Sequence, residues 1–142
     1  MHLIDTNVLI DVVSRDLQWG PWSRHALTVA LEAGAAINPI ILAELAARYS
    51  TPVALHKAFP TDVYAHLDLP WDAAFPTGQA FHRYRQVGGQ RHAPLPDFYI
   101  GAHAQMANLT LITRDPVRYR TYFPSVILIE PKTHFHELAP KP

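Results

Sequence analysis

Four acidic residues occupy positions where an ordinary surface carboxylate would be unusual. Asp5 directly follows the short apolar run His2–Ile4, and Asp115 comes shortly after a second apolar run. Glu44 has apolar neighbours on both sides, and Asp97 stands at the expected start of a helix. Carboxylates gathered in one place repel one another unless a cation is present. Because oxygen ligands without cysteine suit hard cations, the four acids predict a site for Mg²⁺ or Mn²⁺.

Such a site supports hydrolysis of phosphodiester bonds. A bound cation lowers the pKa of a coordinated water and so makes hydroxide available near neutral pH. A second ion about 3.5–4 Å away can stabilise the leaving oxygen. No nucleophilic side chain is required, and the sequence leaves the number of ions open.

The acids are distributed over short apolar strands that alternate with helices. Such alternation implies parallel strands joined by right-handed crossovers, and therefore a three-layer α/β domain. Its site is expected where the strands end, at their carboxyl edge. Segment 52–69 is expected to be helical with an interruption at Pro60, and segment 85–96 is expected to be a loop. Strands are expected at 2–4, 35–37, 109–112 and 126–129, and helices are expected to begin near Thr6, Pro21, Pro39, Trp71 and Pro96.

Composition limits the classes of protein that the sequence can represent. A length of 142 residues with 49% hydrophobic side chains suits one compact domain, expected over residues 1–130 with a tail over 131–142. No secretory signal or membrane span is recognised, and cysteine is absent, so a cytoplasmic protein is expected. A formal net charge of zero argues against tight non-specific binding of DNA.

The acidic segments resemble the motifs of PIN-domain nucleases. Segment 3–11, LIDTNVLID, resembles their opening strand and turn, and Glu44 resembles their second acidic position. Segments 95–104 and 111–115 resemble the third and fourth motifs, so that the resemblance covers 3–129. Chain length and motif spacing are similar to those of VapC toxins from type II toxin–antitoxin systems. The resemblance implies a three-layer α/β/α domain with five parallel strands, Mg²⁺-dependent endoribonuclease activity, inhibition by a cognate antitoxin, and a homodimer.

The resemblance also implies roles for individual residues. Asp5 and Asp97 would be the principal metal ligands, and Glu44 and Asp115 would complete the acidic pocket, partly through water. Some relatives carry a further acid beyond the fourth motif, where this chain has Val-Arg-Tyr at 117–119. The fourth acidic position of the site therefore depends on Asp115 alone. Thr6 and Asn7 would orient Asp5 or a metal-bound water. Thr113 would support the fourth acidic position.

Basic residues near the acids are candidates for contacts with RNA phosphates. Arg85, Arg91 and His92 lie on the glycine-containing segment before Asp97, and Arg114 immediately precedes the fourth acid. The alternative is a solvated loop with no ligand.

Each acid also has a structural interpretation. Asp5 can cap the first helix, and Asp97 can be a favourable charge at the start of a helix. Asp115 before a proline is ordinary turn chemistry, and Glu44 can point to solvent.

Three other functions stay open at this point. A phosphatase of the haloacid dehalogenase-like kind needs a second Asp where this chain has Asn7. A PIN fold can also serve as a non-catalytic module that binds RNA or protein. The third alternative is a PIN nuclease that acts in RNA maturation.

Overall fold

A parallel sheet forms the centre of the computed structural model, which describes residues 1–131. Its five strands lie in the order β3-β2-β1-β4-β5, and every adjacent pair is parallel. The chain builds outward from β1 through β2 to β3, then returns to the other side of β1 for β4. This reversal places a topological switch point between β1 and β4, where open α/β sheets bind ligands at the carboxyl ends of the strands. The strands are β1 His2–Ile4, β2 Ala35–Ile37, β3 Tyr64–His66, β4 Thr110–Ile112 and β5 Leu128–Ile129.

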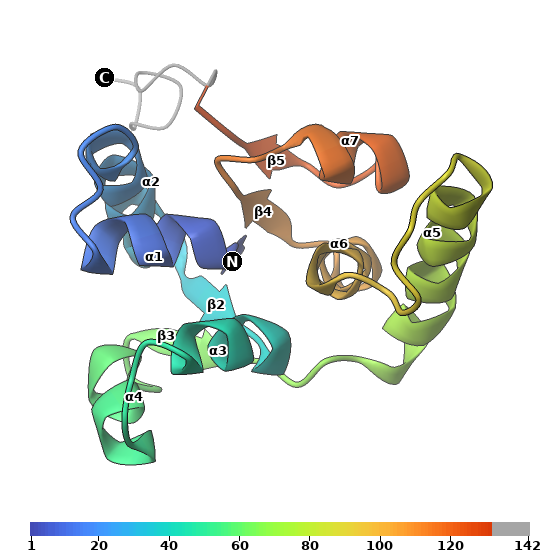
Figure 1. Cartoon of the computed structure of the whole chain (residues 1–142). Coiled ribbons are helices and arrows are strands. Elements are labelled where there is room, and N and C mark those ends of the chain that lie inside the picture. Colours follow the sequence, from blue (N-terminus) through green and yellow to red (C-terminus); the bar gives the residue numbers. More distant parts are fainter. Residues whose placement is uncertain (132–142) are drawn as a thin grey trace.

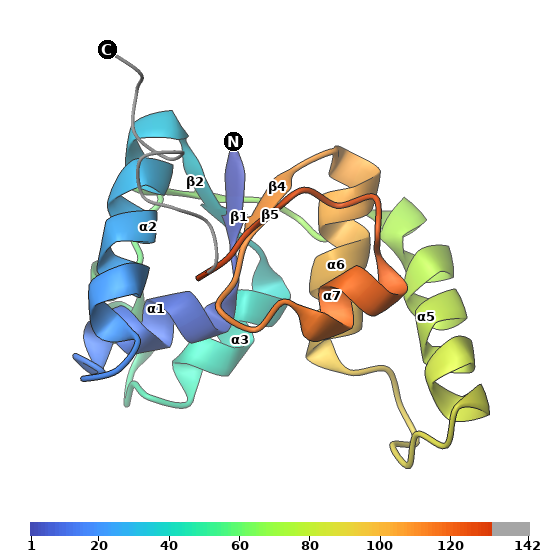
Figure 2. The same cartoon turned by 90° about the horizontal axis from the view of Figure 1, so that it is seen from above.

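Helices cover both faces of the sheet and complete the three layers that the sequence predicted. Helix α2 lies on one side of the strands, whereas α6 lies on the other side with α5 outside it (Figures 1 and 2). Helix α7 packs against α6. The helices are α1 Thr6–Val13, α2 Gly20–Ala33, α3 Pro39–Ala46, α4 Pro52–Ala58, the 3₁₀ helix η1 Trp71–Ala73, α5 Ala74–Gln86, α6 Pro96–Ala107 and α7 Val117–Tyr122.

Local sequence explains where several helices begin. Proline stands at the first position of α3, α4 and α6, where the missing N–H costs no hydrogen bond and the fixed φ suits a helix. Asn38 caps α3, because its Oδ1 accepts a hydrogen bond of 2.9 Å from the backbone N–H of Ile41. Helix α3 therefore starts directly at the end of β2, and this start brings Glu44 to the carboxyl edge of the sheet.

The core is continuous on both sides of the sheet. Both flanking faces of the central strands are apolar, and Leu3, Ile4, Leu111 and Ile112 are completely buried. Helix α6 packs closely against the ring of Phe123, so that a Cβ added to Gly101 would lie 2.3 Å from that ring. The close approach fixes α6 against the segment that follows α7, and the first turn of α6 carries Asp97.

The helix expected over segment 52–69 is wrong beyond its first half. Helix α4 ends at Ala58, and Tyr64–His66 form β3 at the edge of the sheet, paired with β2. Pro60 stops the helix, and the free edge of β2 then aligns three residues whose own pattern is too short to predict a strand. This strand supplies the fifth member of the sheet. The other expected elements are present with shifts of a few residues at their ends.

The expected tail over residues 131–142 lies outside the described residues except for its first member. Across residues 1–131, no helix combines the length and the apolar character that a bilayer crossing requires.

Candidate active site

Asp5 lies at the floor of the site, between the ends of β1 and β4. Its side chain is buried and accepts four hydrogen bonds. The backbone N–H of Thr6 donates to Oδ1 at 2.8 Å, so Asp5 also caps α1. Oδ2 accepts from Thr113 Oγ1 at 2.8 Å, Tyr119 OH at 3.0 Å and Asn7 Nδ2 at 3.3 Å. Asp5 is therefore held in one orientation by groups from three parts of the chain.

The ionised form of Asp5 is nevertheless unfavourable in the metal-free protein. Burial and, second, the negative charge of Asp97 raise the pKa of Asp5 from its ordinary value of 3.8 to about 7. The hydrogen bonds from Thr113, Tyr119 and Thr6 act in the opposite direction and lower this pKa. A cation close to both carboxylates would remove the repulsion and keep Asp5 ionised at neutral pH.

Glu44, in α3, also lies within reach of the charge of Asp97. Its Oε1 accepts a hydrogen bond of 2.8 Å from Thr6 Oγ1. Burial raises the pKa of Glu44, the bond from Thr6 lowers it, and the charge of Asp97 raises it again. Asp97 thus acts on Asp5 and on Glu44 alike. Thr6 contacts Asp5 through its backbone and Glu44 through its side chain, so it couples two of the acids that the sequence singled out.

Asp97 lies in the first turn of α6 and carries a partner that the sequence did not predict. Arg118 of α7 donates from Nη1 to Asp97 Oδ2 at 3.0 Å, and both side chains reach solvent. Asp97 is therefore paired with a positive charge at the solvent-exposed side of the site.

Asp115 lies in the turn between β4 and α7. It follows Thr113, whose Oγ1 accepts a hydrogen bond of 3.0 Å from the Asp115 backbone N–H. Its residue is exposed, and it lines a cavity of about 460 Å³ together with Asp97. Thr113 therefore connects Asp5 with the turn that carries Asp115, and Asp115 stands at the rim of the site.

The donor set suits a hard cation, although the protein does not supply a complete shell. Its candidate ligands are carboxylate oxygens, the ligands that Mg²⁺ prefers. Within residues 1–131, no three His, Asp or Glu side chains converge closely enough to hold a metal ion by themselves. Mg²⁺ usually keeps several waters and takes only one or two carboxylates from the protein. An ion held by Asp5 and Asp97 and completed by water is compatible with this arrangement, and the set of ligands stays a prediction.

Of the basic residues proposed on segment 85–92, Arg85 is bound to backbone within the protein. Arg85 Nη1 donates to the backbone carbonyls of Gly89 at 2.9 Å and of Arg91 at 3.1 Å, so Arg85 braces the loop after α5. Arg91 and His92 lie exposed on that loop. The role of these three residues in RNA binding stays a prediction.

Arg114 has a structural partner in the first helix. Its Nε donates to Oδ2 of the buried Asp11 at 2.7 Å, and Ser23 Oγ donates to the same oxygen at 2.9 Å. The guanidinium carbon lies 5.8 Å from the ring centre of Trp19. Arg114 thus satisfies a buried charge and ties the turn before Asp115 to α1. Its contact with RNA stays a prediction.

Tyr119 is the site residue that sequence reasoning missed. The side chain is buried and donates to Asp5, and burial together with the charges of Asp5 and Asp97 raises the pKa of Tyr119 well above its usual value. The raised pKa favours the protonated hydroxyl, which donates the hydrogen bond to Asp5. Its spacing of four residues after Asp115, one turn into α7, is the only signal that the sequence offers.

Comparison with known proteins identifies the fold. No protein-family model matches the sequence, and no curated protein matches it. A chain of VapBC2 from Rickettsia felis, solved with a DNA fragment from its promoter, has 19% identity and a TM-score of 0.67 over 91% of this chain and 97% of that chain. FitAcB from Neisseria gonorrhoeae gives 22% identity and a TM-score of 0.65 over 91% and 96%. A toxin–antitoxin complex from Klebsiella pneumoniae gives 28% identity and a TM-score of 0.59 over 89% and 96%.

The five-stranded parallel sheet flanked by helices matches the fold of PIN-domain structures. The resemblance to VapC-type toxins that the sequence predicted is confirmed at the level of this fold, over about nine tenths of the chain.

Proposed function

We propose that this chain is a Mg²⁺-dependent endoribonuclease and the toxin of a type II toxin–antitoxin pair. The observation that supports the proposal most is the electrostatic coupling of Asp5, Glu44 and Asp97. The charge of Asp97 raises the pKa values of both other acids, at the sheet edge where α/β folds bind ligands. Repulsion among carboxylates does not stabilise the fold, and acids with perturbed pKa values at a ligand-binding edge favour a catalytic site.

Some residues of the site would bind the cation, and others orient those ligands. Asp5 would hold the cation at the floor, and its orientation is fixed by Thr113, Tyr119 and Asn7. Asp97 would hold it from the first turn of α6. A divalent cation bound there would supply the activated water and the positive charge that hydrolysis of a phosphodiester requires.

Glu44 is suited to orient the attacking water. Its Oε1 is held by Thr6, whereas the residue as a whole is exposed at the mouth of the site. The raised pKa of Glu44 favours acceptance of a proton from a water bound at this position. Cleavage therefore needs no covalent intermediate with the protein.

Purified chain, free of any partner, should cleave total RNA into discrete products in the presence of Mg²⁺. EDTA should abolish cleavage, and Asp5→Asn should abolish it without unfolding the protein. Asp62→Asn, which removes the same charge from an exposed turn before β3, is the matched control and should cleave like the wild type. If folded protein leaves several RNA pools intact with both Mg²⁺ and Mn²⁺, the nuclease proposal fails and a binding module becomes the better account.

The proposed partner is a small antitoxin protein. The similar solved structures include VapBC and FitAB complexes, and several of them are bound to DNA. Expression of this chain alone in a bacterial host should arrest growth, and co-expression of the neighbouring small open reading frame should restore it and yield a stable complex. Absence of growth arrest from a chain that cleaves RNA in vitro would favour a nuclease of RNA maturation instead. A homodimer stays a prediction, for which light scattering of the purified chain is the measurement.

A further inference from the structure

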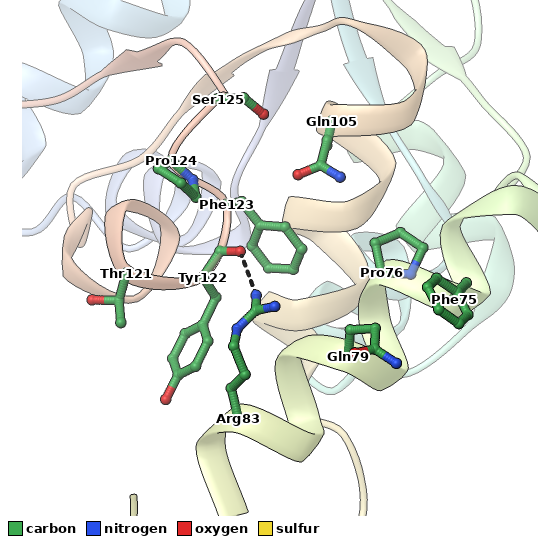
Figure 3. Close-up of a pocket in the computed structure, with 10 residues that line it drawn as sticks. All are labelled: Phe75, Pro76, Gln79, Arg83, Gln105, Thr121, Tyr122, Phe123, Pro124 and Ser125. Atoms are coloured by element: carbon green, nitrogen blue, oxygen red, sulfur yellow. Dashed lines mark hydrogen bonds between the residues drawn. The ribbon is translucent and has the colours of Figure 1, made fainter. Parts of the chain in front are cut away.

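Two cavities of about 460 Å³ each lie along α7, on the side that faces α5. We refer to the one beside the acids as the inner cavity and to the other as the outer cavity. Both volumes fall within the roughly 300–1,000 Å³ typical of ligand sites. Thr121 and Tyr122 line both cavities, so the two adjoin each other along α7. Figure 3 shows the outer cavity, with α5 and α6 as two of its walls.

The inner cavity is continuous with the candidate active site. Asp97 and Asp115 lie in its wall, and the charge of Asp97 acts on Asp5. An RNA strand that is cleaved beside Asp5 and Asp97 extends beyond the scissile bond and needs a surface along which to lie. The inner cavity begins at one of these two acids, and the outer cavity extends the same path.

Two arginines face this path. Arg118 lines the inner cavity and is held in place by one hydrogen bond to Asp97. Arg83 lines the outer cavity, where its Nη2 donates to the backbone carbonyl of Tyr122 at 3.0 Å (Figure 3). An arginine carries five N–H donors in a planar fork that matches phosphate oxygens. Each of these side chains thus makes one hydrogen bond within the protein and has further N–H donors for a ligand.

Aromatic side chains lie beside the two arginines. Phe75 lines the outer cavity with a residue exposure of 75%, so its ring is accessible to a ligand. The guanidinium of Arg83 lies 5.9 Å from the ring centre of Tyr122. Positive groups interleaved with aromatic rings are the pattern with which proteins bind single-stranded nucleic acid, because any base can stack on a ring.

The wall of the inner cavity is held rigidly. Gly89 lies so close to the ring of Tyr84 that an added Cβ would be 2.3 Å from it. Arg85 fixes the same loop through the carbonyls of Gly89 and Arg91. The loop after α5 therefore closes one side of the inner cavity with a defined shape, which favours binding of an ordered ligand.

We infer that the groove between α5 and α7 binds the single-stranded RNA that adjoins the scissile bond. Arg118 contacts the phosphate nearest the acids, Arg83 contacts a phosphate further along, and a base stacks on Phe75. The inference rests on the proposed function, of which it names the substrate path. A formal net charge of zero makes individual arginines decisive, because the protein has no general positive field to hold RNA.

Binding can be measured apart from cleavage. The probe is a fluorescein-labelled RNA octamer of random sequence, titrated with the Asp5→Asn protein in EDTA and followed by anisotropy. Adding Arg118→Gln or Arg83→Gln should weaken binding roughly tenfold. Each should also reduce the slope of log K against log salt by about 0.7, the value for one phosphate contact to a single strand. Arg120→Gln, which has the same charge change on α7 but pairs with Glu130 outside both cavities, should leave the slope unchanged.

The stacking contact has its own pair of variants. Phe75→Ala should weaken octamer binding on the order of 5- to 100-fold with an unchanged salt slope. Trp71→Ala is the control, since Trp71 is 92% exposed but lines neither cavity. Both aromatic side chains are exposed, so both variants should fold, and thermal unfolding verifies this.

The outcomes separate this inference from the proposed function. If the wild type cleaves RNA while Arg118→Gln and Arg83→Gln bind the octamer with the affinity and salt slope of Arg120→Gln, the groove is not the RNA path and the nuclease proposal stands. If these variants lose a protein partner but keep the octamer, the groove is a protein-docking surface and the inference is overturned. Failure of the wild type to cleave any RNA contradicts the proposed function instead.

Discussion

Replacement of Asp5 by asparagine should make the metal-free protein more stable at alkaline pH. The pKa of Asp5 is about 7 in the folded chain and 3.8 in its ordinary state. Folding therefore favours the protonated form, so stability falls as pH rises from about 4 to about 7 and then levels off. At about 1.4 kcal/mol for each pKa unit, the shift of roughly three units costs up to about 4 kcal/mol at pH 8.

Asparagine removes that cost and keeps most of the local structure. It caps a helix about as well as aspartate does, so α1 should keep its N-terminus. The hydroxyls of Thr113 and Tyr119 would lose their bonds to a charge, and this loss offsets part of the gain. We therefore expect Asp5→Asn to be more stable than the wild type by about 1–2 kcal/mol at pH 8.

Urea denaturation in EDTA between pH 5 and pH 8 measures this effect. The difference in the free energy of unfolding between Asp5→Asn and wild type should grow with pH and level off above pH 7, whereas Asp62→Asn should show no such trend. Addition of Mg²⁺ should stabilise the wild type and reduce the difference. A difference that stays constant over this pH range, or that falls as pH rises, would refute the reasoning about Asp5.

Two further predictions concern packing and the support of Asp5. Gly101→Ala should lower the free energy of unfolding by about 1–3 kcal/mol, because its Cβ meets the Phe123 ring. Gly78→Ala, on the exposed face of α5 with open space around its Cβ, should raise it by about 0.5–1 kcal/mol, and equal effects in urea denaturation would contradict the packing. Tyr119→Phe should raise the pKa of Asp5 further, since the Tyr119 bond lowers it. Carboxylate NMR titration should detect this rise, and an unchanged pKa would exclude the contact.

The sequence predicted those parts of the molecule in which local pattern and tertiary position agree. An apolar run that ends in an acid predicts a carboxylate at a strand end, and Asp5 lies there. Proline at a helix start predicted Asp97 in a first turn. Parallel strands bring such positions to one edge, so the gathering of the acids followed from the order of the elements.

The remainder depends on contacts between distant segments. Strand β3 has only three residues and exists because β2 offers a free edge. Arg118 and Tyr119 reach Asp97 and Asp5 because α7 docks against α6, and the pattern of 117–122 does not encode that docking. Likewise, no local pattern indicates that Arg114 pairs with Asp11, a buried acid of α1.

The most direct test of the central claim is the initial rate of cleavage of one RNA as a function of Mg²⁺ concentration. The rate should rise with Mg²⁺ and saturate for the wild type and for Asp62→Asn. Asp5→Asn and Asp97→Asn should show no rate above background at any concentration, although both are folded. Cleavage that persists in EDTA, or a wild-type rate in Asp97→Asn, would contradict the assignment of this acidic edge as a metal-dependent nuclease site.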